Sequence, residues 1–270
     1  MPSTTWSTLT ARTSVSTSTA AGEAFVRDNF SGVAAGSNLS NSIGEVGSGW
    51  TKYLVQNDDI PTSINDNALI SSEGRVYHGV GIEGAYYHAL DVPPSADYRI
   101  LGNITRMSTQ PFGVLDLLAR IDSSTSDTRY GARYSLHNTK QWELYKVVNK
   151  VGAGLGTPYV DEISVGATRA VRFDIEGSAM TLYIDGVARI NATDSSITLA
   201  GRAGISIATF DIATARSTDT LGLHLDNFIV ETLSSITTAV SPIPAWTARS
   251  GASSTWALGS AASTLWSTLT

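Results

Sequence analysis

Two carboxylates that could act together, Asp174 and Glu176, stand two residues apart in a segment whose apolar residues alternate. Alternation predicts a β-strand, and residues two apart on a strand point to the same face. Hydrolysis of a glycoside requires a carboxylate pair, one acting as acid and the other as base or nucleophile. A strand face exposed to solvent explains this pair more simply, so we expect no glycosidase activity from it.

The four histidines offer little support for a metal site or a catalytic triad. Only His224 shares a predicted strand face with a carboxylate, that of Asp226. No Gly-x-Ser-x-Gly sequence is present, so a serine nucleophile lacks its strand-to-helix turn. Gly79, Gly81 and Gly84 have the spacing of a dinucleotide loop, but a strand rather than a helix follows them, which favours a turn. The sequence therefore predicts that the protein is not an enzyme.

The segments that would position these side chains are predominantly β-strands. Asp185-Gly186 between two apolar runs predicts a tight hairpin, and the more continuously apolar segment 112–121 predicts a strand covered on both faces. No amphipathic helix of ten or more residues is evident. We therefore predict an all-β fold, an antiparallel two-sheet sandwich. Apolar and polar residues alternate most clearly in residues 97–105, 129–136, 141–147 and 170–176.

Both ends of the chain differ in composition from its middle. Residues 1–22 and 234–270 are rich in Ser and Thr and nearly free of charge, whereas residues 23–233 carry nearly all the charged side chains. We therefore expect one globular domain at 23–233 with extended N- and C-terminal arms.

Tryptophan recurs in these arms at Trp6, Trp246, Trp256 and Trp266. The last three are ten residues apart, so in an extended chain their side chains point the same way. Each indole ring can bury a large apolar area in a contact. We predict that these four tryptophans bind partner subunits, including copies of this chain; packing against the parent domain is the alternative.

Composition excludes several other functions. The net charge of −6 and the lack of a Lys/Arg cluster argue against a nucleic-acid partner. The absence of cysteine excludes disulfides and zinc–thiolate sites. No apolar run is long enough to span a bilayer, so we expect no membrane insertion. The N-terminus lacks a charged leader and an apolar stretch, so we expect no secretory signal.

The order of short phrases in the middle of the chain resembles the concanavalin A-like lectin and glucanase jelly roll, especially its laminin G-like branch. The resemblance covers about 23–233 and implies a jelly-roll fold. The arms resemble the Trp- and Ser/Thr-containing repeats of bacteriophage tail and other virion proteins, which implies a location in a virion. The phrases that carry the first resemblance are Phe25-Val-Arg-Asp28-Asn29-Phe30, Gly49-Trp50, Arg169-Ala-Val-Arg-Phe173, Leu182-Tyr-Ile-Asp185-Gly186, Ala203-Gly204-Ile205 and Leu225-Asp226-Asn227-Phe228.

The resemblance also implies where a metal could bind. First and last strands of such folds lie side by side, which would place Asp28 near Asp226, and carboxylates at a sandwich rim can bind calcium. The alternative is that both accept hydrogen bonds from backbone amides at strand ends. Trp50 matches the core tryptophan of the fold. The Glu-x-Asp-x-x-Glu strand of the glucanases is missing, which again argues against hydrolysis.

Sugar binding is the remaining expectation that the resemblance carries. A sugar site combines aromatic surface with a few polar side chains that bind hydroxyl groups. Trp142 shares a strand face with Leu144, so we expect it to be buried rather than to bind sugar. The carbohydrate-binding candidates are Tyr86, Tyr87, Arg133, Tyr134 and Tyr145.

Two functional hypotheses follow. In the first, the protein is a non-enzymatic virion component whose arms anchor a jelly roll to other virion proteins and to copies of itself, with the domain available for attachment to host-surface glycans. In the second, it is a free carbohydrate-binding lectin module that needs neither arm.

Overall fold

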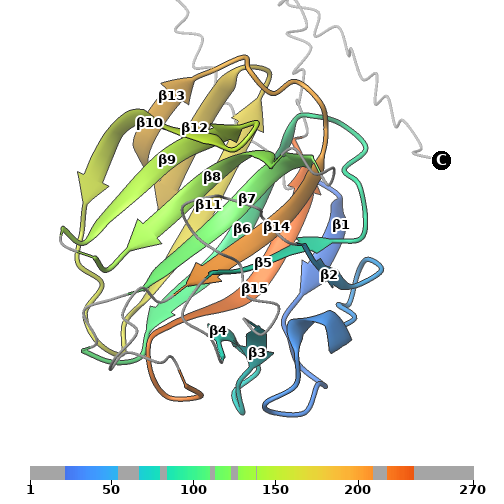
Figure 1. Cartoon of the computed structure of the whole chain (residues 1–270), viewed down its shortest axis with the longest axis vertical. Helices are drawn as coiled ribbons and strands as arrows, with labels where there is room; N and C mark the ends of the chain where they lie inside the picture. The colour runs from blue at the N-terminus through green and yellow to red at the C-terminus, as the bar shows by residue number, and fades with distance from the viewer. Residues whose placement is uncertain are drawn as a thin grey trace, which may run out of the picture. The chain divides into compact units, whose positions relative to one another are not determined.

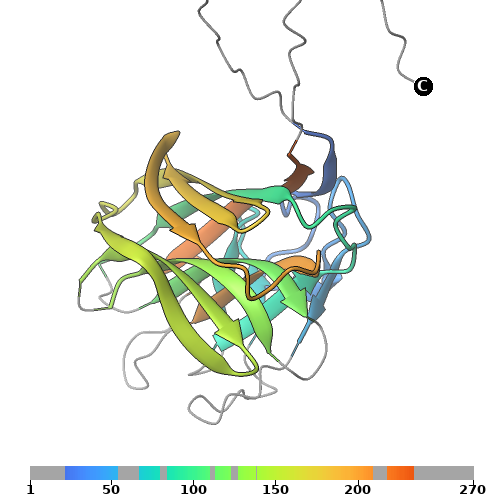
Figure 2. The ribbon, with the colours of Figure 1, turned by 90° about the horizontal axis from the view of Figure 1, so that it is seen from above.

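The computed structural model describes residues 22–53, 67–79, 84–109, 113–122, 127–137, 139–208 and 218–233. In this part of the chain, fifteen β-strands form two antiparallel sheets packed face to face (Figure 1). Figure 2 shows the sheets as two layers. The predicted all-β, two-sheet sandwich is confirmed. The tryptophans assigned to partner binding, Trp6, Trp246, Trp256 and Trp266, lie outside the described residues.

Sheet A contains eight strands, seven of them in one continuous order. The eighth, β1 (Ala24–Asp28), pairs with β15, so that the first and last strands are neighbours as predicted. The continuous order is β13 (Val187–Thr193), β12 (Ala179–Ile184), β11 (Thr168–Glu176), β6 (Tyr98–Arg106), β15 (Leu223–Thr232), β4 (Val76–His78) and β3 (Ala68–Ile70).

Sheet B contains seven strands and has β10 at one end and β2 at the other. The two sheets approach each other at the β10 end, where Gly156 lies against Asn191 and Ile190 of β13. The order is β10 (Val151–Val160), β9 (Gln141–Val148), β8 (Thr128–Ser135), β7 (Val114–Asp122), β14 (Arg202–Ala208), β5 (Gly84–Ala89) and β2 (Trp50–Lys52).

Alternation of side chains along each strand builds the core between the sheets. Val171, Phe173 and Ile175 of β11 are all buried, and each contributes about 1.5–3 kcal/mol through removal of apolar surface from water. On β9, Trp142 and Leu144 face the same core, so the prediction that Trp142 is buried is confirmed.

A buried hydrogen-bond cluster fixes the start of the domain. The carboxylate of Asp28 accepts from Nε1 of Trp50 at 2.7 Å, from Oγ of Ser42 at 2.8 Å and from the amide of Phe30 at 2.7 Å. The Trp50 ring packs on Phe228 of β15, with ring centroids 4.9 Å apart. The structural role predicted for Trp50 is therefore confirmed.

The short helix η1 (Leu39–Asn41) begins after Asn38. Oδ1 of Asn38 accepts from the amide of Ser40 at 2.9 Å and from Oη of Tyr87 at 2.9 Å, which ties this turn to the core. Within the described ranges, no helix has the length and apolar character needed to cross a membrane.

Candidate functional site

A row of polar and aromatic side chains crosses the outer face of sheet B. Ser206 pairs with Tyr86 on one side and with Asp116 on the other, and Arg133 pairs with both Asp116 and Glu143. Directly opposed residues on neighbouring strands point to the same face. These five side chains come from the five adjacent strands β5, β14, β7, β8 and β9, and therefore form one continuous row.

The centre of the row is an ion pair between β7 and β8. Arg133 donates from Nε to Oδ1 of Asp116 at 2.8 Å and from Nη2 to Oδ2 at 3.1 Å. Oη of Tyr145 donates to the same Oδ2 at 2.8 Å. The side chain of Asp116 is 0% exposed and that of Arg133 is 27% exposed. The carboxylate raises the pKa of the Arg133 guanidinium, which therefore stays charged.

Arginines and a tyrosine form a ridge along β8. The ring of Tyr145 reaches from β9 across Gly131, where a Cβ atom would overlap it. The guanidinium carbon of Arg133 lies 4.5 Å from the centroid of that ring. Arg129, two residues before Gly131 on the same strand face, is close enough to Tyr145 to interact with its hydroxyl. We call Arg129, Arg133 and Tyr145 the Arg–Tyr ridge.

On the side of the ridge toward β7 and β14, the described neighbouring side chains leave no accessible cleft. The outward side chains there, Asp116, Leu118 and Ser206, are all buried. Tyr86 is buried as well, and the guanidinium carbon of Arg129 lies 5.0 Å from its ring centroid. Burial also raises the pKa of Tyr145 far above its ordinary value of 10. The part of the face directly beside the ridge therefore consists of packed side chains.

The other side of the ridge is open. A cleft of about 360 Å³ lies over β9 and β10, and we call it the β10 cleft. Its floor is glycine-rich: a Cβ atom on Gly154 would have no neighbour within 4 Å, and one on Gly152 would only touch Lys146. The described side chains that line it include Arg133, Glu143, Tyr145 and Pro158.

The chemistry available in the β10 cleft is hydrogen bonding beside an aromatic ring. Arg133 uses Nε and Nη2 for Asp116, which leaves Nη1 as the nitrogen that can donate to a ligand. Oε1 of Glu143 accepts from Nε2 of Gln141, and Oε2 can accept from a ligand. Among the described residues that line the cleft, Glu143 is the one carboxylate, so a glycosidase pair is not present there.

The structure brings together three of the five predicted carbohydrate-binding residues. Tyr86, Arg133 and Tyr145 lie on the outer face of sheet B. Tyr87 and Tyr134 do not, and this part of the prediction is wrong. Both point between the sheets with no exposed surface, because each follows an outward residue by one position.

Sequence reasoning missed Asp116, Arg129 and Glu143. The segment 112–121 was predicted to be a strand covered on both faces, and residues 114–121, which belong to β7, are all buried. The available signal was Asp116, the single carboxylate in this segment, with apolar residues on both sides, since a buried charge requires a partner. Register between β7 and β8 supplies that partner, and register across a sheet is not evident in a single sequence.

The other predicted groups lie elsewhere. Asp174 is on the outer face of sheet A, where Arg99 and Arg172 approach it at 3.5 and 3.1 Å. His224 is buried, and its Nε2 lies 3.1 Å from the carbonyl oxygens of Thr218 and Leu221. These contacts are those of structural side chains.

Asp28 and Asp226 were predicted to bind calcium. Asp28 is occupied by three protein donors, as described above, and Oδ1 of Asp226 accepts from the amide of Asn227 at 2.7 Å. In the described ranges, no group of three or more His, Asp or Glu side chains is arranged to hold a metal ion. These residues do not fit a calcium site well, and calcium binding stays a prediction.

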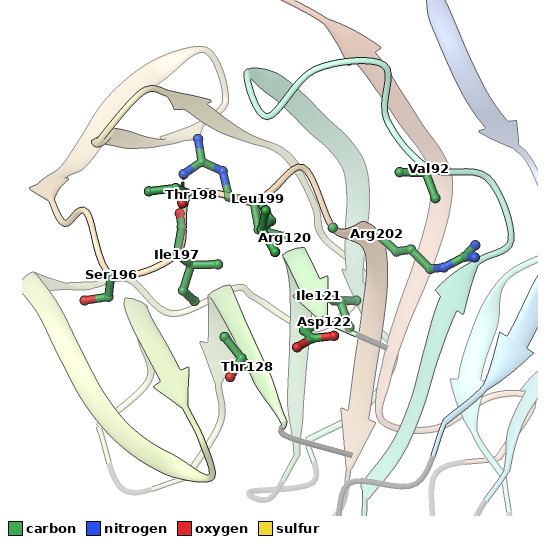
Figure 3. Close-up of a pocket in the computed structure, with 11 residues that line it drawn as sticks. Val92, Arg120, Ile121, Asp122, Thr128, Ser196, Ile197, Thr198, Leu199 and Arg202 are labelled. Atoms are coloured by element: carbon green, nitrogen blue, oxygen red, sulfur yellow. Dashed lines mark hydrogen bonds between the residues drawn. The ribbon is translucent and has the colours of Figure 1, made fainter. Parts of the chain in front are cut away.

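A second hollow, of about 390 Å³, lies at the rim of the sandwich, and we call it the rim hollow. Figure 3 shows Thr128 at the end of its strand, Leu199 on the segment above it, and Val92 and Arg202 opposite. Among the described residues that line it, none is aromatic. The β10 cleft, which has an aromatic ring beside charged groups, is therefore the better candidate for a sugar site.

Arg120 lines the rim hollow and connects the loops around it. It lies in a bulge of β7 with a φ of +50°, and its guanidinium donates to the carbonyl oxygens of Ile197 at 2.6 Å, Ala96 at 2.9 Å and Gly177 at 2.8 Å. Three loops are thereby joined by one buried cation, whose donors are satisfied by backbone acceptors.

No protein-family model matches the chain, and no curated protein matches it. Solved structures do match in fold. A carbohydrate-binding module, CBM66 from Bacillus subtilis, has a TM-score of 0.51 and 17% identity, over 69% of this chain and 97% of that one. LamA from Zobellia galactanivorans, in complex with laminaritriose and laminaritetraose, has a TM-score of 0.54 and 9% identity, over 79% of this chain and 100% of that one.

These likenesses establish the fold alone. The described domain has the concanavalin A-like jelly-roll fold, as the sequence resemblance implied. That fold includes glycan-degrading enzymes as well as binding modules, so the fold does not decide between hydrolysis and binding. The comparisons do not bear on a virion.

Proposed function

We propose that the domain at 23–233 is a non-catalytic carbohydrate-binding module whose ligand occupies the β10 cleft. One observation carries this proposal: in a cleft of about 360 Å³, the guanidinium of Arg133 stacks on Tyr145 and stands opposite Glu143 on the next strand. The volume falls within the range of about 300–1,000 Å³ that small-molecule sites occupy.

The two charged side chains suit a pair of neighbouring hydroxyl groups. Nη1 of Arg133 donates to one hydroxyl oxygen, and Oε2 of Glu143 accepts from the other hydroxyl. The ion pair with Asp116 and the stacking on Tyr145 hold the guanidinium in place before a ligand arrives, which lowers the entropic cost of binding.

Binding without hydrolysis is supported by the state of the carboxylates. Asp116 is fully buried and accepts from Arg133 and Tyr145, so it is unsuited to deliver a proton to a leaving group. Glu143 alone does not provide the two carboxylates that glycoside hydrolysis uses.

The test is a glycan array probed with the full chain, with cello-, laminari-, manno- and xylo-oligosaccharides measured by calorimetry. We expect saturable binding that Glu143→Gln weakens by about tenfold or more, the value of a charge-assisted hydrogen bond. Glu176→Gln, at an exposed carboxylate of sheet A, is the matched control. Binding unchanged by Glu143→Gln, or release of reducing sugar from a bound glycan, would contradict the proposal.

A second candidate is the virion component inferred from the arms. It is supported by the ten-residue recurrence of Trp246, Trp256 and Trp266 in an almost uncharged segment. On this proposal the arms anchor the domain to other virion proteins and to copies of this chain, and the domain attaches to host glycans. Deleting residues 234–270 should leave a folded domain that no longer enters particles. Normal incorporation of the truncated chain would contradict it.

A further inference from the structure

The β10 cleft is bounded on two opposite sides. The Arg–Tyr ridge bounds it toward β8, since Arg133 and Tyr145 belong both to the ridge and to the cleft lining. A bulge in β10 bounds it on the opposite side: Leu155 pairs with Leu144 and Tyr159 pairs with Trp142, so residues 156–158 all stand opposite Glu143.

The ridge is a barrier because the described side chains directly behind it are buried. Asp116, Leu118 and Ser206 have no more than 1% of their surface exposed, so a ligand that passed over β8 would have no open surface to contact. In contrast, the β10 residues that line the cleft are mostly exposed. The accessible surface of the β10 cleft therefore ends at the ridge.

The ridge is also held firmly in position. The ring of Tyr145 fills the notch above Gly131, and its hydroxyl is bonded to Asp116. Arg133 is held by two hydrogen bonds to the same carboxylate, and Arg129 pairs with Asp127, so the guanidinium groups of the ridge each have a buried counter-charge. A ligand would have to break these bonds to extend across β8.

We infer that the β10 cleft binds the end of a glycan chain, one or two sugar units, and that the Arg–Tyr ridge sets this limit. The inference rests on the proposed function and adds a ligand class to it: chain termini rather than internal segments of a polysaccharide. The small volume of the cleft agrees with a short ligand, since it lies near the lower end of the range for small-molecule sites.

The first experiment measures how affinity depends on chain length, using full-length protein and the di-, tri- and tetrasaccharides of the cello, laminari, manno and xylo series. For the series that binds, we expect affinity to stay within about twofold from di- to tetrasaccharide, because added units make no contacts. We also expect the number of protein molecules bound per mass of polymer to increase as the polymer is cut into shorter chains.

The second experiment opens the ridge. Tyr145→Ala removes the ring above Gly131 and the bond to Asp116, so we expect the ratio of tetrasaccharide to disaccharide affinity to increase by about fivefold, whatever the loss of absolute affinity. Tyr145→Phe keeps the ring and should leave the ratio unchanged. If Tyr145→Ala does not fold, the chain-length series on the unaltered protein decides alone.

The two hypotheses fail in different ways. Affinity that increases steadily from di- to tetrasaccharide in the unaltered protein would overturn the inference about chain ends while the binding proposal stands. No binding by any of the four series and none on the array would overturn the proposed function, and the inference with it.

Discussion

The phenol ring of Tyr145 occupies the space that a side chain at Gly131 would fill. The two residues are directly opposed on β8 and β9, and Gly131 is flanked on its own strand face by Arg129 and Arg133. Without a side chain at position 131, the ring can lie flat across β8, reach Asp116 with its hydroxyl and stack on Arg133. A single glycine thus permits the ridge that bounds the candidate site.

Gly131→Ala is expected to displace the ring of Tyr145, because the new methyl group would overlap it and the strand backbone cannot move away from its two neighbours. Overpacking of this kind costs about 1–3 kcal/mol in the free energy of unfolding. Urea denaturation measures that loss, and calorimetry should show weaker glycan binding. Gly152→Ala, which would only touch the carbonyl oxygen of Lys146, is the control; equal effects of the two changes would refute the packing argument.

Arg133→Ala is expected to destabilise the domain by about 3–5 kcal/mol, because it leaves the fully buried Asp116 without its counter-charge. The double change Asp116→Ala with Arg133→Ala should cost less than the sum of the two single changes. Denaturant titration of all four proteins completes the cycle. Additive losses would mean that the two side chains do not stabilise each other.

Gly201→Ala tests the bulge under the rim hollow. Gly201 has a φ of +56°, and a Cβ atom there would overlap the backbone of Arg120. Gly177→Ala is a closely matched control, since Gly177 has the same φ but open space around it. The control should lose about 1–2 kcal/mol of unfolding free energy from left-handed backbone strain alone, and Gly201→Ala clearly more. Similar melting temperatures for the two variants would contradict this view of the bulge.

Acid should weaken the fold through His224. Burial lowers the pKa of this side chain below its ordinary value of 6.5, so the folded protein keeps it neutral while the unfolded chain takes up a proton. Its contribution to stability is therefore complete above pH 6.5 and decreases as the pH falls below it. Unfolding free energies at neutral pH and about one unit below 6.5 measure the effect. His224→Gln should flatten this dependence; an unchanged slope would assign it to other groups, such as His88, whose pKa burial also lowers.

Calcium binding can be tested by melting the protein with calcium and with a chelator. Asp28 already accepts from Trp50, Ser42 and Phe30, so we expect its hydrogen bonds rather than a metal to determine stability. Asp28→Asn should then lower the melting temperature equally in both conditions. A calcium-dependent increase that is lost in Asp226→Asn would instead establish the predicted metal site.

Alternation along single strands was the part of the structure that sequence reasoning predicted best. It placed Trp142 and Leu144 in the core and Tyr145 on the opposite face, and all three positions are confirmed. The predicted sugar site, however, included both Tyr86 and Tyr87 of β5, a strand in which every residue is buried. Adjacent residues of a strand cannot both point outward, so one of the two had to be wrong.

The partners of the site residues could not be predicted in the same way. Asp116 and Arg133 are 17 residues apart and meet because β7 and β8 are paired in a particular register. Tyr145 reaches Asp116 across the intervening strand, at a separation of 29 residues. Such contacts depend on the turn between the strands and on the packing of the whole sheet, neither of which a single sequence specifies.

The bulge at residues 156–158 has a consequence beyond the cleft. β10 is the outermost strand of sheet B, and a regular outermost strand offers unpaired backbone groups to which another chain can add. Here the backbone departs from the ladder, Gly156 takes a φ of +69°, and Pro158 has no N–H to donate. The same three residues should therefore keep the domain from stacking strand to strand into aggregates at high concentration.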